Sequence, residues 1–486
     1  MHIAFITAYD IRNPYQVSLP PLGIGYLSAW VKQNCPHVTT SFHHTVDDLV
    51  DSKPDMVAVS STSENFTDAT LIAEEAKDRL NGVPVVLGGM HITSIPHVLP
   101  KVYDCGVIGE GENTFLNLVR LYDSSPGRRP IEQDLAKING ICWHQNGQVV
   151  INPSADLIKD LDELPYPDRK TIDHGWKLDA SDTIHLISSR GCPYKCSFCS
   201  SSLHWKRFRF FSPEYVAKEI EYLRNRYNPE ILYFFDDLFV GHIGRWRKVV
   251  ELFRERKLHQ GVQFRAYARV DLLTDQMASE FDELNFRFID FGLESNSQKI
   301  LTYLTKTRVT PEINQQALDL CFKHNISVGA NFIIGSPDET SDDLMETYRF
   351  AEENRIKIDR CSVGPLQPLP GTPIWNEAKS KGLVSDDMDF GVLGVTYDKF
   401  DFATFPFMCE KQSQEEFWNN WTKFNWLAKE INYGGFMKRL QYQRRKSEQQ
   451  AALYRQELDK LKGSRLIKAA NWLRGLIRKE ETIYVN

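Results

Sequence analysis

The fold is decided by one stretch near the middle of the chain. It reads Ser188-Ser189-Arg190-Gly191-Cys192-Pro193-Tyr194-Lys195-Cys196-Ser197-Phe198-Cys199. Random placement of the chain's nine cysteines would give this CxxxCxxC spacing in only about 0.3% of chains of this composition. A structural zinc site needs four closed ligands, usually two CxxC pairs, and no second pair follows. Three thiolates can instead hold three irons of a 4Fe-4S cluster and leave the fourth iron open.

Segments typical of strands and helices alternate around and after this loop. The candidate strands are 183–188, 231–235, 262–267, 286–291, 327–334 and 360–366, with helical patterns at 213–226, 244–256, 274–284, 296–324 and 340–355. Alternation of this kind predicts a parallel sheet covered by helices. We therefore expect a partial (βα)6 barrel over residues 181–375, with the cysteines on the loop after its first strand.

The cysteine motif, with the aromatic Phe198 before its last cysteine, resembles the radical S-adenosylmethionine superfamily. The resemblance implies that the open iron binds the amino and carboxylate groups of S-adenosylmethionine. The reduced cluster then cleaves this molecule to methionine and a 5′-deoxyadenosyl radical. The alternatives are a zinc site or a redox-neutral cluster at Cys192, Cys196 and Cys199.

Several residues at the ends of the barrel strands resemble the S-adenosylmethionine contacts of that family. They are Phe198, Asp237, Arg269, Glu294, Ser295, Asn331 and Gly335. A carboxylate such as Glu294 can accept hydrogen bonds from ribose hydroxyls or from the ammonium group. The alternative for Glu294 is a helix cap, and for the other charged residues an ordinary surface charge at a strand end.

Residues 1–140 alternate short apolar runs with amphipathic stretches. The runs at 2–7, 56–60 and 85–87 and the helical patterns at 22–33, 68–80 and from 113 predict a doubly wound (Rossmann-like) parallel α/β sheet. Glycines at Gly88-Gly89 and at Gly109 and Gly111 follow predicted strands. Such glycines let the backbone approach a ligand at the carboxyl edge of the sheet, or they form ordinary tight turns.

This region also resembles the cobalamin-binding domain that precedes the barrel in one branch of the superfamily. The residues that carry the resemblance and are implied to bind cobalamin are Pro21, Leu22, Gly23, Ser60, Ser61, Thr62, Gly88, Gly89, His91, Gly109, Glu110 and Gly111. The Asp-x-His-x-x-Gly motif that supplies a histidine to cobalt in other cobalamin proteins is absent. The resemblance therefore implies that no histidine ligates cobalt, and some proteins of this architecture have lost the cofactor.

The remaining segments are expected to be a β segment and linker at 141–180, an aromatic-rich closing subdomain at 376–435 and a basic helical tail at 436–486. Net charge is -6, but 438–479 carries thirteen Lys and Arg against three acids. The acidic body argues against nucleic acid binding. Leu466, Leu473 and Ile477 recur at helical spacing among basic residues, which predicts peripheral contact with an anionic membrane or, alternatively, a solvated helix.

The composition, with 42% hydrophobic and 25% charged residues, is that of a folded water-soluble protein. The absence of a long apolar run and of a secretory signal predicts a cytoplasmic location. The resemblance implies a class B cobalamin-dependent methyltransferase acting on an unactivated carbon of a small molecule, with electrons from a flavodoxin- or ferredoxin-type donor. The alternatives are radical rearrangement, cyclisation or oxidation without net methylation, and a non-catalytic cobalamin or iron–sulfur sensor.

Overall fold

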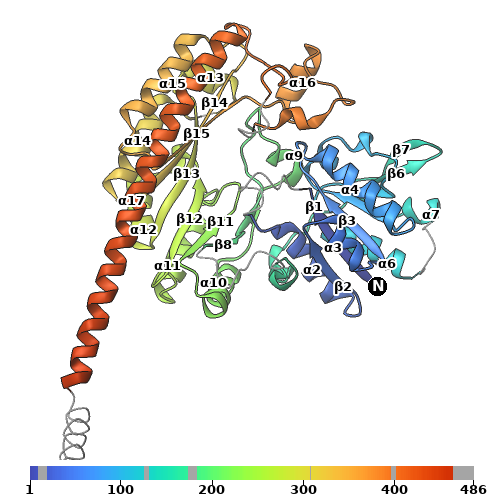
Figure 1. Cartoon of the computed structure of the whole chain (residues 1–486), viewed down its shortest axis with the longest axis horizontal. Helices are drawn as coiled ribbons and strands as arrows, with labels where there is room; N and C mark the ends of the chain where they lie inside the picture. Colours follow the sequence, from blue (N-terminus) through green and yellow to red (C-terminus); the bar gives the residue numbers. More distant parts are fainter. Residues whose placement is uncertain (9–18, 125–130, 173–182, 307, 396–400, 464–486) are drawn as a thin grey trace, which may run out of the picture. The chain divides into compact units, whose positions relative to one another are not determined.

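The computed structural model describes residues 1–8, 19–124, 131–172, 183–306, 308–395 and 401–463. The chain divides into two units, Met1–Ala428 and Lys429–Asn486. Both sheets belong to the first unit (Figure 1). No helix within the described residues is long and apolar enough to cross a membrane.

The first sheet contains seven strands in the order β2-β1-β3-β4-β5-β6-β7. These are β1 (His2–Thr7), β2 (Thr39–His43), β3 (Met56–Ser60), β4 (Val85–Gly88), β5 (Cys105–Val107), β6 (Ile141–Gln145) and β7 (Gln148–Ile151). The first five are parallel, as the sequence predicts, while β6 and β7 are antiparallel. From β1 the chain passes to β2 on one side of it, and from β2 it crosses to β3 on the other side of β1. The switch point of this doubly wound sheet therefore lies between β1 and β3.

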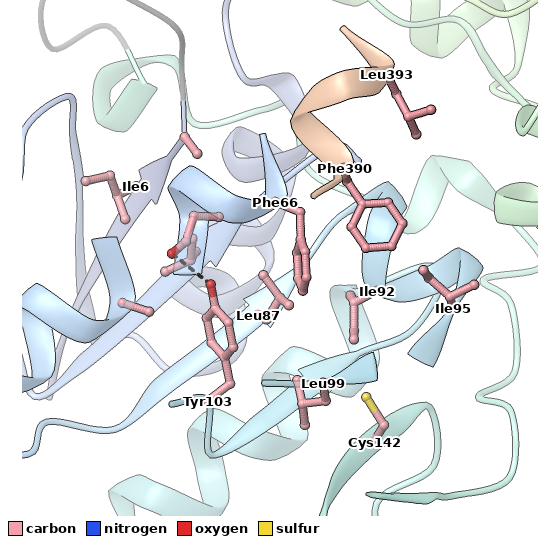
Figure 2. Close-up of a cluster of buried hydrophobic side chains, with 14 of the residues drawn as sticks. Ile6, Phe66, Leu87, Ile92, Ile95, Leu99, Tyr103, Cys142, Phe390 and Leu393 are labelled. Atoms are coloured by element: carbon pink, nitrogen blue, oxygen red, sulfur yellow. Dashed lines mark hydrogen bonds between the residues drawn. The ribbon is translucent and has the colours of Figure 1, made fainter. Parts of the chain in front are cut away.

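Helices cover both faces of this sheet. They are α2 (Leu22–Asn34), α3 (Val46–Asp51), α4 (Phe66–Arg79), α5 (Met90–Ser94) and α6 (Glu112–Asp123), followed by the short α7 (Glu132–Leu135) and α8 (Arg169–Ile172). Successive residues of a strand face opposite sides, so Ile3 and Phe5 of β1 join one buried cluster and Ala4 and Ile6 the other. Figure 2 shows the second cluster, where Tyr103 donates a hydrogen bond to the carbonyl of Ala69 at 2.8 Å.

Two strands of this sheet, β2 and β5, are not predicted by the sequence pattern. β2 is mostly polar and β5 has only three residues, so neither gives a clear alternating pattern. The β segment expected near 140–151 forms the β6–β7 hairpin, and β6 pairs with β5. A boundary at residue 140 therefore cuts this sheet, whereas one after β7 keeps it whole.

The second sheet contains six parallel strands in the order β15-β14-β13-β12-β11-β8. They are β8 (Thr183–Leu186), β11 (Ile231–Phe234), β12 (Gln263–Ala268), β13 (Phe286–Glu294), β14 (Ser327–Ile334) and β15 (Arg360–Pro365). Each strand pairs with the next along the chain, and β8 and β15 remain as edges, which is the predicted partial barrel (Figure 1).

Helices α10 (Pro213–Tyr227), α11 (Ile243–Glu255), α12 (Asp275–Glu283), α13 (Gln298–Tyr303), α14 (Pro311–Lys323) and α15 (Ser341–Glu353) connect these strands. The single helix expected at 296–324 is wrong, because α13 and α14 are separate. Pro311 occupies the first turn of α14, where its missing N–H costs nothing, and the Thr310 side chain accepts from the Ile313 N–H. At this break the Leu304 carbonyl accepts a hydrogen bond from the Ser197 N–H of the cysteine loop.

The aromatic-rich segment contains α16 (Pro373–Ser380), a 3-10 turn at Phe390–Leu393 and the start of α17 (Gln414–Gly463). Phe390 packs edge-on against Phe66 of α4 at 5.8 Å between ring centres (Figure 2). Phe417, Trp421 and Phe424 of α17 are buried. Most of these aromatics thus belong to the core. The predicted amphipathic stretch that begins at Leu466 lies outside the described residues.

Candidate functional site

The cysteine loop leaves and re-enters the fold through a two-stranded ribbon. Its strands β9 (Ser189–Arg190) and β10 (Arg209–Phe210) are antiparallel, and Arg190 is the direct partner of Arg209. Between them lie the three cysteines and α9 (Ser201–Trp205). Gly191 has φ +83°, and a side chain there would come within 2.9 Å of the Arg207 carbonyl. Only glycine fits this turn without strain.

Carboxylates at the end of β11 fix the start of the loop. Buried Asp236 accepts hydrogen bonds from the Ser188 N–H at 3.0 Å and the Ser189 hydroxyl at 2.5 Å. Burial raises the pKa of Asp236 to about 6. Asp237 accepts from the Gly191 N–H at 3.2 Å. Further along the loop, the Ser197 N–H donates to the carbonyl of Leu304, just past α13, at 3.1 Å.

The three cysteines fit a 4Fe-4S cluster. All are free thiols and all are partly exposed. A cluster takes one thiolate per iron, so three cysteines on one loop can ligate three of its irons. Burial raises the pKa of Cys192, and it raises that of Cys199 to about 11, so ligation must displace the thiol protons.

Three of the residues expected to bind S-adenosylmethionine gather at this loop. Arg269 lies with Nη1 3.8 Å from the Cys196 Sγ and its guanidinium 3.6 Å from the centre of the Tyr194 ring. Glu294 is buried, has φ +62° and accepts from Lys306 Nζ at 2.6 Å. Lys306 Nζ also lies 6.0 Å from the centre of the Phe198 ring. Arg269 therefore contacts the cysteine loop directly, and Glu294 is linked to its Phe198 through Lys306.

The other expected contacts have partners within the protein. The Ser295 hydroxyl is fully buried, 3.0 Å from the Thr347 hydroxyl of α15, and Asn331 Nδ2 donates to the Phe291 carbonyl at 3.1 Å. Gly335 has φ +89° and its N–H donates to the Glu339 carboxylate. Asp237, described above, bonds the loop itself. These residues shape the barrel edge, and the Ser295 hydroxyl in particular is directed toward α15.

A cavity of about 480 Å³ opens at the carboxyl ends of β1, β3, β4 and β5, where doubly wound sheets bind ligands. Ten residues expected to bind cobalamin line it, namely Pro21, Gly23, Ser60, Ser61, Thr62, Gly88, Gly89, Gly109, Glu110 and Gly111. Its far wall is formed by Ile187, just after β8, by Arg190 of the ribbon, and by His204 and Trp205 of α9. The cavity therefore adjoins the segment that carries the cysteines.

The glycines of the cavity differ in what they do. A side chain at Gly23 would meet nothing within 4 Å, so this position leaves open space. At Gly89, with φ +104°, it would come within 2.4 Å of the Ser61 carbonyl, and at Gly111 it would meet Leu27 at 3.3 Å. Gly89 is thus required by the protein itself, whereas a side chain at Gly111 would need only a small shift of Leu27, and Gly23 keeps room for a ligand.

Two residues expected at this site, Leu22 and His91, do not line the cavity. Leu22 is buried in the core on one face of the sheet. His91 has no exposed surface, and its ring stacks on Phe66 at 3.8 Å with Nδ1 3.1 Å from the Ser63 hydroxyl. Burial lowers the pKa of His91 to about 3, so the ring is neutral at physiological pH. It is a core residue.

Four residues at these two sites were not predicted from the sequence. Arg190, His204 and Trp205 line the cavity, and Lys306 binds Glu294. Arg190 directly precedes Gly191 in the cysteine motif, so its place in the sequence could have predicted that it lies at the site. His204 and Trp205 stand on α9, beyond the last cysteine, where no spacing marks them. Lys306 was hidden within the helix expected at 296–324.

The cysteine loop lies at the edge of an open βα barrel, and the cavity beside it lies at the switch point of a doubly wound sheet. This arrangement is typical of a cluster-dependent enzyme with a second cofactor site. The family model of the radical SAM superfamily matches residues 186–351, and that of the B12 binding domain matches residues 11–119. Both matches fall on the two sheets described above.

Known proteins of the same kind share most of the chain. An uncharacterized methyltransferase of Pyrococcus horikoshii is 32% identical over 393 residues, covering 78% of this chain and 82% of the relative. The anaerobic magnesium-protoporphyrin IX monomethyl ester cyclase of Rubrivivax gelatinosus is 28% identical, covering 79% of this chain and 69% of the relative. The radical S-adenosylmethionine methyltransferase TsrM of Kitasatospora setae, solved with cobalamin and a 4Fe-4S cluster, has the same fold, with TM-score 0.65, 17% identity and coverage of 79% and 75%.

The chain belongs to the radical SAM superfamily, in the branch whose members carry a B12 binding domain. It is a radical S-adenosylmethionine enzyme, and its cofactors are a 4Fe-4S cluster, S-adenosylmethionine and cobalamin.

Proposed function

We propose that this enzyme methylates an unactivated carbon of a small molecule by a radical route. One observation carries the proposal: Arg190, His204 and Trp205, which flank the three cysteines in the sequence, line the cavity of the B12 binding domain. A methyl carrier and a radical generator in adjoining sites can act on the same substrate carbon. The methyltransferases among the relatives support the same reaction.

The protein's own residues bind and shield the reactants. Glu294 presents a buried carboxyl group that can accept from the ribose hydroxyls or the ammonium group of S-adenosylmethionine, and Lys306 Nζ donates a hydrogen bond that holds it in place. The Arg269 guanidinium stacks on Tyr194 and lies beside the Cys196 sulfur, which positions both. When bound, the cluster supplies the electron that cleaves S-adenosylmethionine, and cobalamin carries the methyl group. The substrate loses one hydrogen atom and gains the methyl.

The second candidate is radical cyclisation or oxidation without net methylation. A magnesium-protoporphyrin IX monomethyl ester cyclase at 28% identity favours it, since that protein covers 79% of this chain. Both candidates need 5′-deoxyadenosine as a product, and only methylation needs S-adenosylhomocysteine. A cobalamin or cluster sensor would form neither product.

The test uses full-length protein reconstituted anaerobically with iron, sulfide and cobalamin, reduced, and supplied with methyl-deuterated S-adenosylmethionine. We expect 5′-deoxyadenosine and S-adenosylhomocysteine together, with the deuterated methyl group recovered in the cobalamin fraction. Formation of 5′-deoxyadenosine alone would overturn methylation and favour the cyclase-type reaction. Formation of neither product by protein that holds about four irons would overturn both.

We further propose that a flavodoxin- or ferredoxin-type protein supplies the electron, because cleavage of S-adenosylmethionine needs one electron at the cluster. We also propose that the basic tail docks peripherally on an anionic membrane. Support comes from the thirteen basic residues against three acids within 438–479. Each basic residue near such a surface contributes about 1 kcal/mol.

A further inference from the structure

A single carboxylate ties the base of the cysteine loop to the cobalamin cavity. Glu110, in the turn after β5, accepts from Arg190 Nη1 at 2.5 Å and from Arg209 at 3.0 and 3.1 Å. Arg190 and Arg209 are direct partners across the β9–β10 ribbon, through which the loop leaves and returns. Glu110 therefore holds both ends of the cysteine loop at once.

Neighbouring groups complete this bridge. Arg190 Nη2 also donates to Glu112 at 2.6 Å, and Arg209 Nη1 donates to the Ile158 carbonyl at 2.5 Å. The Ile158 N–H donates in turn to Glu110 at 2.9 Å. Two guanidinium groups thus face two carboxylates, and the formal charges of these four side chains cancel. We call Glu110, Glu112, Arg190 and Arg209 the interdomain bridge.

The interdomain bridge is buried. The side chains of Arg190 and Glu110 are only 3% and 4% exposed. Burial by itself raises the pKa of Glu110, but Arg190 and Arg209 outweigh this effect and lower it, so Glu110 is ionised at neutral pH. A buried ion network adds little net stability, because desolvation offsets the attraction between its charges. It does fix geometry, since guanidinium–carboxylate pairs are directional.

The same side chains form part of the cavity wall. Glu110, Glu112 and Arg190 all line the cavity. The guanidinium of Arg190 lies 5.2 Å from the ring centres of both Tyr26 and Trp205, which are also wall residues and come from α2 and α9. A shift of the cysteine loop would therefore move Arg190 and Trp205 and change the shape of the cavity. A ligand bound in the cavity would in turn contact these residues and affect the position of the loop.

We propose that Glu110 is a positioning residue that sets the cysteine loop against the cobalamin cavity through Arg190 and Arg209. Cobalamin binding and the environment of the cluster are thereby coupled, and by linkage the coupling acts in both directions. Direct contact of Glu110 with cobalamin is a different role, and the Arg209 variant below separates the two.

The experiment compares full-length protein with Glu110→Gln and with Arg209→Lys. Each is reconstituted with its cluster, and cobalamin affinity is measured by titration. The electron paramagnetic resonance spectrum of the reduced cluster is recorded without and with cobalamin. Lysine keeps the charge of Arg209 but loses the planar fork that meets Glu110 twice. Glu283→Gln, which alters an exposed two-bond pair with Arg254 between α11 and α12, is the matched control.

We expect both bridge variants to bind cobalamin at least about tenfold more weakly, with full iron content, and to lose most of the change that cobalamin causes in the cluster spectrum of the unaltered protein. Glu283→Gln should behave like the unaltered protein. A wild-type spectral response in both variants would overturn the proposal. Weak binding by Glu110→Gln with normal behaviour of Arg209→Lys would also overturn it, since Glu110 would then act only as a cobalamin contact. If Glu110→Gln fails to fold, Arg209→Lys alone decides.

Discussion

Glu294 combines three features that a purely structural residue rarely shares. It is buried, it has a left-handed backbone conformation that side chains other than glycine seldom adopt, and its charge is matched by one lysine, Lys306. Local strain of this kind costs about 1–3 kcal/mol and persists where the surroundings enforce it. Its place beside the cysteine loop makes it the best candidate to contact S-adenosylmethionine.

Replacing Glu294 by glutamine should therefore slow cleavage of S-adenosylmethionine by about a hundredfold, because the charge that accepts from the ligand is lost. It also leaves the buried Lys306 unpaired, which costs about 3–5 kcal/mol of stability. Iron content and 5′-deoxyadenosine formation are measured in parallel. The double variant Glu294→Gln with Lys306→Met should regain stability but not cleavage. Unchanged 5′-deoxyadenosine production in Glu294→Gln would make it a structural residue only.

His91 should make the protein less stable in acid. Its pKa is about 3 in the folded protein and about 6.5 in an unfolded chain, so below pH 6.5 the unfolded state binds a proton that the folded state does not. Stability is then lost as pH falls from about 6.5 toward 3. His91→Phe, which can still stack on Phe66, should reduce the loss between pH 7 and pH 5 by about 2 kcal/mol. Urea unfolding at both pH values measures this, and an equal loss in both proteins would contradict it.

Among elements, the β9–β10 ribbon and its glycine turn determine where the cysteines stand. Asp236 holds the entering chain and the Leu304 carbonyl holds the middle of the loop. The second contact exists only because the chain breaks between α13 and α14. The loop is thus shaped by several elements and has little regular structure of its own.

Gly191→Ala should lower the iron content of reconstituted protein severalfold. The added methyl group would meet the Arg207 carbonyl at 2.9 Å, and the left-handed backbone costs about 1–2 kcal/mol for alanine. Gly147→Ala is the matched control. Gly147 has a similar φ of +81° in the β6–β7 turn, and its added methyl group would meet nothing within 4 Å. Iron and sulfide analysis of both variants checks this, and equal iron content would contradict it.

The start of α2 forms one wall of the cavity, and Gly23 on it leaves open space. Gly23→Leu should fill part of that space and weaken cobalamin binding about tenfold or more. Gly23→Ala should bind normally and gain about 0.5–1 kcal/mol of stability, because alanine favours helix. Spectroscopic titration with cobalamin measures both variants. Normal binding by Gly23→Leu would show that cobalamin does not occupy this part of the cavity.

At the scale of the molecule, the first 15 residues of α17 belong to the unit that contains both sheets, and the rest of the helix belongs to the second unit. Phe417 packs on Gly335, at the end of β14, where a side chain added to the glycine would meet its ring at 3.0 Å. The first part of α17 is therefore required for the barrel edge.

A chain ending at Gly435 keeps that packing, so it should retain S-adenosylmethionine cleavage while losing membrane association. We expect full-length protein to sediment with anionic liposomes at low salt and to be released at high salt, because the attraction is electrostatic. The shortened protein should stay in the supernatant. If neither protein sediments at low salt, the membrane proposal fails. Loss of cleavage on shortening would show that residues 436–486 are needed by the fold.

Patterns in the amino-acid sequence predict the two alternating α/β regions and the cysteine motif, and ten of the twelve residues expected to bind cobalamin do line the cavity. These features depend on periodicity and on fixed local spacings, such as CxxxCxxC and glycines after strands, which need no knowledge of distant contacts. The surroundings of individual side chains depend instead on contacts between distant segments. His91 is a core residue because Phe66 and Phe390 cover it, and Phe390 comes from a segment about 300 residues away in the chain.

The interdomain bridge is the clearest case. Glu110 and Arg190 are 80 residues apart, and Glu110 and Arg209 are 99 apart. Each motif could be seen in the sequence, but their contact depends on how the barrel packs against the first sheet. Packing of that kind is set by the sum of many side-chain contacts across the interface. No local pattern encodes it, so only the folded chain shows that one carboxylate joins the two cofactor sites.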